Sequence, residues 1–360
     1  MLMTTLPVHL HHVWDYTQVD RDFWDRHLEG FIPKDLVDAH THVTAPDSRL
    51  HPMTDQMKKQ YWVGEVAEPI SLDDELRVTD LVWPGRRIRK VCFGWPDLDF
   101  DLEASNRYLA EECPKEDWWN LALVRPTWSR QQIEAQLLHP RTVGFKPYYA
   151  LIEHTPHSRD VHQEASIYDF LTPLLLEIAN DRGLWVTLHV PKADRLGHPS
   201  NIKEIRQIRE KYPAIKLMLA HLGRCYTKEH ACEALPLLAD DPGLFFDNSA
   251  VLNPDVHRFA LETLGPQRIL YGSDNPVFYM RGRRQWHGRS YVNRTSYPFH
   301  FNRNREAPET EACYTLYMYE ALNAIRIACS DLRLTPQDVR DLFCGNALRL
   351  LDEITSMNAP

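Results

Sequence analysis

The chain has no hydrophobic run long enough to cross a membrane as a helix. Its residues 1–14 are too polar and too rich in histidine for a secretory signal peptide. Seven cysteines stand at irregular spacings, which form neither a disulfide framework nor a C-x-x-C zinc motif. We therefore expect reduced thiols in a cytoplasmic protein.

The chain also lacks an excess of positive charge. Its formal net charge of −9 is spread over the sequence, which argues against a general nucleic-acid binder and against a polybasic membrane patch. No G-x-G-x-x-G follows the first predicted strand, which weakens the dinucleotide-binding alternative. What is present is 360 residues, 43% of them hydrophobic, which is enough to bury a large core.

From residue 36 onward, short β-branched or aromatic runs alternate with helical patterns, which is typical of repeated β-α-β units. Strands are predicted at 35–42, 90–94, 119–125, 142–147, 184–190, 215–221, 244–249 and 268–274. Helices are predicted at 102–111, 129–138, 167–182, 201–212, 229–239, 254–264, 309–330 and 335–351. Eight strands with intervening helices predict an α/β fold, a distorted (β/α)8 TIM barrel.

Two long insertions interrupt this alternation, residues 44–89 after the first strand and 276–310 after the eighth. Connections that follow barrel strands lie at the C-terminal mouth, so both insertions are expected to border the active site. Residues 1–34 are predicted to be an N-terminal helical extension, with an amphipathic helix at 20–28 that packs on the barrel or on a partner subunit. Residues 35–360 are predicted to form the barrel itself.

Two histidines, His40 and His42, stand two residues apart at the end of the first predicted strand. In an extended strand, residues i and i+2 point to the same face, so both imidazoles can reach one point. Neutral imidazole is a common ligand of zinc and its neighbours, so the pair indicates part of a metal site. Asp38 lies on the same face and is a candidate to hold a histidine from behind.

Polar residues end other predicted strands as well: Lys146 the fourth, His189 the fifth, His221 the sixth and Asp274 the eighth. Taken singly, each has an ordinary structural explanation, as a hydrogen-bonded core histidine, a solvent-reaching lysine or a turn-forming aspartate. In a barrel, however, strand ends converge on one mouth, where packing alone predicts Val, Ile or Leu. The set as a whole therefore predicts a metal site.

The segments DAHTH, GFK, LHV, AHLG, YGSD and FCGNALRLL occur in this order. Through them, about residues 36–351 resemble the amidohydrolase superfamily, and within it the amidohydrolase-2 group. That group includes aminocarboxymuconate-semialdehyde decarboxylase and several lactone hydrolases. The resemblance implies a barrel of the metal-dependent hydrolase type that binds one divalent metal, zinc or alternatively manganese. The ligands that it implies are His40, His42, His189 and Asp274.

The same resemblance implies that His221 is a catalytic residue that does not bind the metal. Asp274 could also take the proton from the metal-activated water. Lys146 has two interpretations. Other branches of the superfamily carboxylate a lysine on the fourth strand, which then bridges two metals. For this chain we favour a contact with the acid group of the substrate, or a structural charge.

The insertion 276–310 interleaves arginines with aromatic residues. A solvated loop or an oligomer contact explains this composition as well as a segment that closes over the mouth. In the second case, arginines would pair with a carboxylate or phosphate of the substrate, and aromatic rings would stack on it. On that hypothesis, Arg281 and Arg284 bind substrate, together with Trp62 of the first insertion.

We expect a hydrolase that acts on a small, anionic substrate, through attack of a metal-activated water on a lactone, ester-like or amide-like bond. The alternative is a non-oxidative decarboxylase of an aromatic or muconate-type acid, because the superfamily hosts both chemistries. A third hypothesis, a barrel that binds a ligand without converting it, is disfavoured by the presence of Asp274 and His221. A homodimer or higher homo-oligomer is expected, with 1–34 and 309–330 as candidate interface elements.

Overall fold

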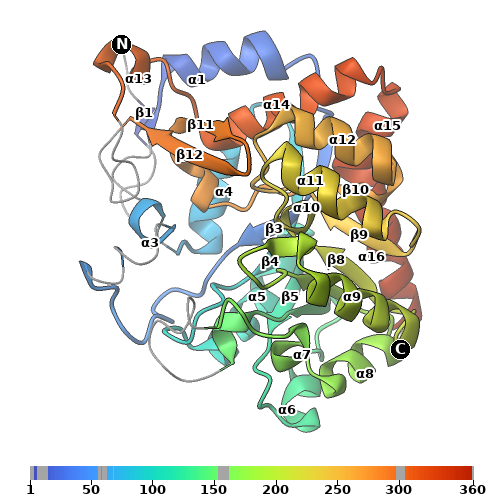
Figure 1. Cartoon of the computed structure of the whole chain (residues 1–360). Coiled ribbons are helices and arrows are strands. Elements are labelled where there is room, and N and C mark those ends of the chain that lie inside the picture. The colour runs from blue at the N-terminus through green and yellow to red at the C-terminus, as the bar shows by residue number, and fades with distance from the viewer. Residues whose placement is uncertain are drawn as a thin grey trace.

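The computed structural model describes residues 4–5, 15–55, 58, 63–67, 69–152, 162–296 and 305–358. Its centre is an eight-stranded sheet in the order β10-β9-β8-β7-β6-β5-β4-β3, in which every neighbouring pair is parallel. The strands are β3 (Asp35–His42), β4 (Arg87–Phe93), β5 (Trp119–Leu123), β6 (Thr142–Lys146), β7 (Trp185–Leu188), β8 (Lys216–Leu219), β9 (Leu244–Asp247) and β10 (Ile269–Leu270). The predicted (β/α)8 barrel is confirmed, with most strands shorter than predicted (Figure 1).

The barrel closes along a seam between β3 and the segment that follows β10. The backbone N–H of Asp274 donates to the carbonyl of His40 at 2.8 Å, and that of His42 donates to the carbonyl of Asn275 at 2.8 Å. Because β10 itself has only two residues, these bonds complete the seam where regular pairing has ended. The seam therefore ties the backbone of two predicted metal ligands directly to each other.

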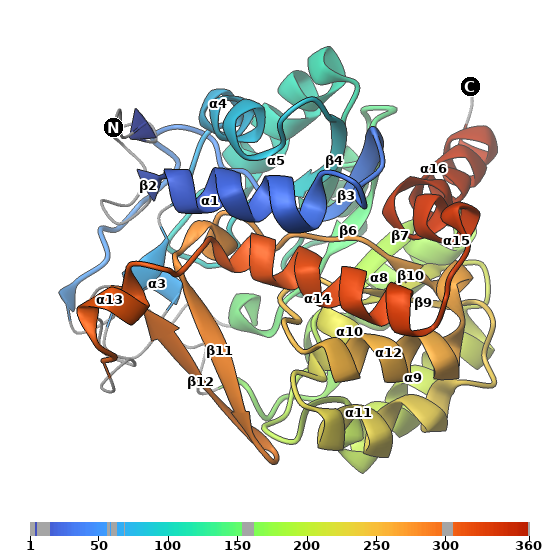
Figure 2. The same ribbon diagram turned by 90° about the horizontal axis from the view of Figure 1, so that it is seen from above.

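Helices cover the outside of the barrel (Figures 1 and 2). Those between strands are α4 (Leu72–Val82), α5 (Leu102–Glu112), α6 (Arg130–Ala135), α7 (Ile167–Phe170), α8 (Pro173–Asp181), α9 (Pro199–Lys211), α11 (Lys228–Ala234) and α12 (Pro254–Leu264). After the barrel come α13 (Pro308–Glu311), α14 (Tyr317–Asp331), α15 (Pro336–Arg340), a π-helical turn (Asp341–Gly345) and α16 (Asn346–Met357). Among the described helices, none combines the length and the apolar composition that a bilayer crossing requires.

The helix ends follow local sequence rules. Ser71, Asp101, Ser129, Thr172 and Thr335 are N-cap residues, and the side chain of each accepts a hydrogen bond from a backbone N–H in the first turn. This satisfies one of the donors that a helix start leaves without an intrahelical partner.

The prediction of a single long helix at 309–330 is wrong. The structure has α13 and α14 instead, separated by residues 312–316. The carbonyl of Thr315 accepts from the N–H of Gly282 at 3.0 Å, so the backbone here pairs with another segment. This long-range pairing uses groups that a continuous helix would need for its own ladder.

The insertion after β10 is also more regular than predicted. It contains an antiparallel hairpin of β11 (Gly282–His287) and β12 (Ser290–Thr295), joined by a two-residue turn at Gly288 and Arg289. Gly288 has a φ of 57°, the left-handed conformation that such turns favour. The run Tyr-Val-Asn-Arg-Thr after a glycine was a signal for this hairpin.

The N-terminal segment packs against the outside of the barrel. It comprises α1 (Gln18–Phe23) and a π-helical continuation (Trp24–Leu28), which lie beside α14 in Figure 2. Asp20, which is fully buried, forms an ion pair with Arg281, with Nη1–Oδ1 and Nη2–Oδ2 distances of 3.0 and 2.5 Å. This pair joins the N-terminal helix to the segment just before β11.

Removal of Arg281 should therefore destabilise the whole fold. In Arg281→Ala, the Asp20 carboxylate stays buried without its cation, which we expect to lower the free energy of unfolding by about 3–5 kcal/mol. Arg258→Ala, which breaks an exposed pair with Asp255, should change it by less than about 1 kcal/mol. Urea denaturation of both variants measures the difference, and equal midpoints would contradict the assignment.

Candidate active site

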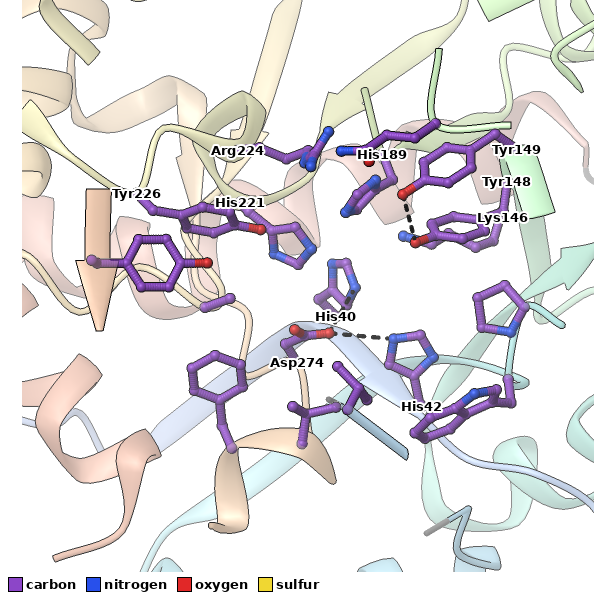
Figure 3. Close-up of a pocket in the computed structure, with 18 of the residues that line it drawn as sticks. His40, His42, Lys146, Tyr148, Tyr149, His189, His221, Arg224, Tyr226 and Asp274 are labelled. Atoms are coloured by element: carbon purple, nitrogen blue, oxygen red, sulfur yellow. Dashed lines mark hydrogen bonds and ion pairs between the residues drawn. The ribbon is translucent and has the colours of Figure 1, made fainter. Parts of the chain in front are cut away.

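A cavity of about 250 Å³ lies at the C-terminal ends of the barrel strands. Six of the residues predicted at strand ends border it: His40, His42, Lys146, His189, His221 and Asp274. Figure 3 shows their side chains converging from separate elements. The barrel thus brings this predicted set to one place.

Asp274 lies opposite the two histidines of β3. Its Oδ1 is 3.4 Å from Nε2 of His40 and 3.3 Å from Nε2 of His42. Asp274 has a φ of 61°, in the left-handed region that is uncommon for residues other than glycine but that aspartate adopts more readily than most. Two residues earlier, Gly272 passes so close to β3 that an added Cβ would lie 2.9 Å from the Cβ of His40. A side chain at this glycine would push Asp274 away from the histidines.

A second aspartate, Asp247 at the end of β9, contacts His40, His221 and Ser249. Its Oδ2 lies 3.0 Å from Nδ1 of His40, and its Oδ1 accepts from the backbone N–H groups of His221 at 3.0 Å and Ser249 at 3.1 Å. Asp38 does not have the expected role behind an imidazole, because its carboxylate accepts instead from the backbone N–H of His40 at 3.1 Å. The register of β3 shifts between Asp38 and residue 41, which breaks the simple i, i+2 pattern.

His221 follows β8 in an unusual turn, α10 (His221–Arg224). All four residues have φ between 50° and 68°, so four successive residues, three of them not glycine, adopt the left-handed conformation. Such backbone costs free energy and concentrates at functional sites. The turn places the His221 ring 4.9 Å from the His40 ring, between centroids.

The hydrogen bonds of the imidazoles determine which nitrogen faces the cavity. Nδ1 of His40 lies against the Asp247 carboxylate, and Nδ1 of His42 lies 3.2 Å from the carbonyl of Gly94. Carboxylate and carbonyl oxygens only accept, so Nδ1 carries the proton in both rings and Nε2 presents a lone pair. Two lone pairs then face the Asp274 carboxylate without a proton between them. This donor set fits a divalent cation.

The ligand atoms of His40, His221 and Asp274 lie within 4.8 Å of one another, as metal ligands would. His42 adjoins this cluster through its contact with Asp274. His189 lies further out, with its ring centroid 5.2 Å from that of His221. The cluster thus includes His221, which the resemblance implies to be a non-ligand.

The electrostatic surroundings favour the ligand forms of these groups. Burial lowers the pKa of His40 to about 3, and the charge of Lys146 adds to this effect against the opposing charge of Asp247. Burial works to raise the pKa of Asp274, but His221 and the two histidines of β3 outweigh it and hold this pKa below its usual value. Neutral imidazole and ionised carboxylate are the forms that bind metals.

Not all of the predicted substrate-binding residues are found at the cavity. Lys146 is only 1% exposed, and its Nζ lies 4.7 Å from the centroid of the Phe93 ring. Arg284 borders the cavity. Arg281 does not: it is buried in the ion pair with the N-terminal helix, so the expected substrate contact is not found. Trp62 lies outside the described residues.

The sequence analysis missed three residues. Asp247 lies inside the seventh predicted strand, 244–249, and only the shorter observed strand β9 ends at this residue. Arg224 and Tyr226 border the cavity directly after the AHLG segment. Nη1 of Arg224 donates to the carbonyls of Val190 at 3.1 Å and Lys192 at 2.8 Å. No sequence signal marked either residue, since their orientation depends on the left-handed turn.

The sequence and the fold were compared with known proteins. The Amidohydro_2 family model, described as Amidohydrolase, matches residues 37–352. No curated protein matches significantly. Among solved structures, an amidohydrolase from Burkholderia multivorans with bound zinc has a TM-score of 0.56 at 13% identity, over 88% of this chain and 99% of the other.

Two decarboxylases are also similar in structure. The 5-carboxyvanillate decarboxylase LigW from Sphingomonas paucimobilis has a TM-score of 0.53 at 15% identity, over 89% of this chain and 99% of the other. The 2,6-dihydroxybenzoate decarboxylase from Rhizobium has a TM-score of 0.50 at 14% identity, over 89% and 99%. At these identities, the likeness shows the fold alone.

Burial of neutral His40 predicts a pH-dependent stability. The ordinary pKa of histidine is 6.5, and that of His40 in the folded chain is about 3. At pH values between these two, the unfolded chain binds a proton at His40 that the folded chain excludes, so acidification favours unfolding. We expect the metal-free protein to lose from this residue about 1.4 kcal/mol of unfolding free energy per pH unit within this window. Urea denaturation of wild type and His40→Gln over the window checks this, and equal slopes would contradict it.

Proposed function

Because the chain belongs to the Amidohydro_2 family of amidohydrolases, we propose that it is a metal-dependent hydrolase of a small, anionic substrate with a lactone, ester-like or amide-like bond. The observation that carries the proposal is the set of imidazole lone pairs from His40 and His42 that face the Asp274 carboxylate at 3.4 and 3.3 Å. These groups repel one another unless a cation lies between them.

We propose that one divalent metal is bound by His40, His42, His189 and Asp274, with zinc favoured and manganese as the alternative. A zinc-bound amidohydrolase of similar fold supports the choice of zinc. The cluster of His221 with His40 and Asp274 supports a variant in which His221 also contacts the metal. When bound, the metal supplies a Lewis acid that acidifies water and polarises a carbonyl.

The residues of the chain then have distinct roles. The Asp274 carboxylate, whose pKa lies below its usual value, accepts the proton of the attacking water. His221 stays neutral because burial lowers its pKa, and its Nδ1 lies 2.8 Å from the hydroxyl of Ser249. That hydroxyl donates to Asp247, so it accepts from His221. The His221 Nε2 therefore presents a lone pair, which can accept a hydrogen bond from water and orient it.

The charge around the cavity supports an anionic substrate. Arg224 and Arg284 border it, and Arg195 lies behind them. In the described part of the chain, none of the three forms an ion pair with a carboxylate, and their partners are carbonyls, an amide oxygen, a histidine and aromatic rings. A carboxylate on the substrate would supply the missing counter-charge. We propose Arg224 and Lys146 as its binding groups.

The second candidate is a non-oxidative decarboxylase of an aromatic or muconate-type acid. Rings of Trp95, Tyr148, Tyr149 and Phe278 border the cavity, which suits a planar acid. Decarboxylases are among the proteins of similar fold. In this case, Asp274 would first take a proton from water and then pass it to the carbon from which CO2 departs.

We place the protein in the cytoplasm, acting on a small molecule. All seven cysteines are free thiols, five of them at least partly shielded from solvent, which supports a reducing compartment. A homodimer or higher homo-oligomer remains a prediction.

Metal content tests the proposed site. Wild type loaded with zinc should retain about one equivalent per chain, as a mononuclear site does. Asp274→Ala should lose most of it, and Asp247→Asn should bind about 10- to 100-fold more weakly because His40 loses its partner. Asp255→Ala, on the surface of α12, is the control. Elemental analysis after gel filtration measures the zinc content. Full retention of zinc in Asp274→Ala would contradict the proposed site, and two equivalents per wild-type chain would point to a carboxylated Lys146 that bridges two metals.

Product analysis separates the two reactions. We expect acid release from at least one member of a lactone panel, with kcat reduced roughly 10²- to 10⁴-fold in Asp274→Asn because the proton acceptor is lost. Asp255→Asn should retain wild-type rates. The same preparations are tested for CO2 release from aromatic and muconate-type acids. CO2 release without any lactone hydrolysis would replace the hydrolase proposal with the decarboxylase.

A further inference from the structure

The β11–β12 hairpin lies against the loops that follow β8 and β9. Nε1 of Trp286 donates to the carbonyl of Tyr226 at 3.0 Å, and Nη1 of Arg284 donates to the carbonyl of Ala250 at 2.9 Å. Tyr226, Ala250 and Arg284 all border the cavity. The hairpin therefore forms part of the cavity wall, although the family resemblance of the chain does not explain this insertion.

Arg284 is the centre of this contact. It is only 5% exposed, and its Nε donates to the side chain of Asn293, its cross-strand partner, at 2.9 Å. Its guanidinium carbon lies 4.2 Å from the ring centroid of Tyr291 and 5.6 Å from that of Tyr226. The two rings meet edge to face, with centroids 5.6 Å apart. Arg284 thus locks the two tyrosines into one arrangement.

A second arginine supports the same ring from the barrel side. The guanidinium carbon of Arg195 lies 5.1 Å from the ring centroid of Tyr226, and its Nη1 lies 2.8 Å from Nδ1 of His230. Tyr226 is therefore held by two guanidinium groups, one ring and its own backbone carbonyl. This degree of fixation exceeds what packing of a partly buried tyrosine needs.

The hydroxyl of Tyr226 is the unused group. Figure 3 shows it turned toward the His221 ring, whose centroid lies 6.1 Å from that of Tyr226. No described residue hydrogen-bonds to this hydroxyl, whereas the ring contacts Arg195, Arg284 and Tyr291. Burial raises its pKa, so it remains a proton-bearing donor. Arg224, two residues earlier, reaches the same side of the cavity (Figure 3).

We propose that Tyr226 binds substrate, donating a hydrogen bond from its hydroxyl to an anionic oxygen beside Arg224, and that Arg284 of the hairpin is the positioning residue that fixes it. The proposal rests on the proposed function only in taking this cavity as the substrate site. The hairpin thereby adds a specificity element to the barrel: its two strands determine where the donor stands, while the barrel itself supplies the reacting centre.

The test is binding of benzoate, a small planar carboxylate, measured by calorimetry on zinc-loaded and metal-free protein. Tyr226→Phe removes only the hydroxyl and should raise the Kd about tenfold, as expected for one lost hydrogen bond to a charged acceptor. Arg284→Gln should raise it severalfold. The Kd of the double variant should equal that of Tyr226→Phe within about twofold, because Arg284 acts through the Tyr226 hydroxyl. Arg258→Gln, an exposed arginine on α12, is the matched control and should bind as wild type.

Three outcomes overturn the proposal. These are no benzoate binding by wild type, an unchanged benzoate affinity in Tyr226→Phe, or a double variant whose loss of affinity is the product of the two single losses. Where Arg284→Gln fails to fold by thermal melting, Asn293→Ala provides a milder loss of the same support. Metal content is measured in every sample. Absence of metal from wild type would end the proposed metal-dependent function, yet the benzoate cycle on metal-free protein would still decide the role of Tyr226.

Discussion

The geometry of the cavity depends on the buried carboxylate of Asp247. It joins the imidazole of His40 on β3 to the backbone of His221 after β8 and to Ser249 after β9. A carboxylate without exposure to water is costly unless it accepts several hydrogen bonds, and here the bonds come from three separate elements. The same bonds therefore stabilise the ion and align the two histidines, because neither can move without leaving the charge unsatisfied.

Around this centre, the barrel and the insertion contribute differently. The barrel seam and the close passage of Gly272 place Asp274 against β3 through backbone contacts, which tolerate little variation. The hairpin instead approaches through side chains of Arg284 and Tyr291, which can change without altering the barrel. A rigid reacting centre with a separately built wall is the usual way in which one fold serves different substrates.

Much of the fold was predictable from local sequence. Short apolar runs between helical patterns located all eight strands, because strands buried on both faces are mostly apolar until they end. The polar residues at those ends, such as His189 and Lys146, could then be assigned to one mouth, since parallel strands of a barrel all end on the same side. The hairpin was not predicted, because its arginines were a more prominent sequence feature than the alternation around Gly288.

The sequence by itself determined the barrel, its mouth and the polar residues gathered there, since these follow from periodicity and strand order, whereas the predicted choice of metal ligands among them came from the family resemblance. Only the tertiary structure decided which charges pair. Arg281 was expected in the cavity but neutralises Asp20, and Asp247 rather than Asp38 holds the His40 imidazole. The physical reason is that the free energy of a buried charge depends on partners within a few ångströms. These partners lie far apart along the chain, so no local pattern records them.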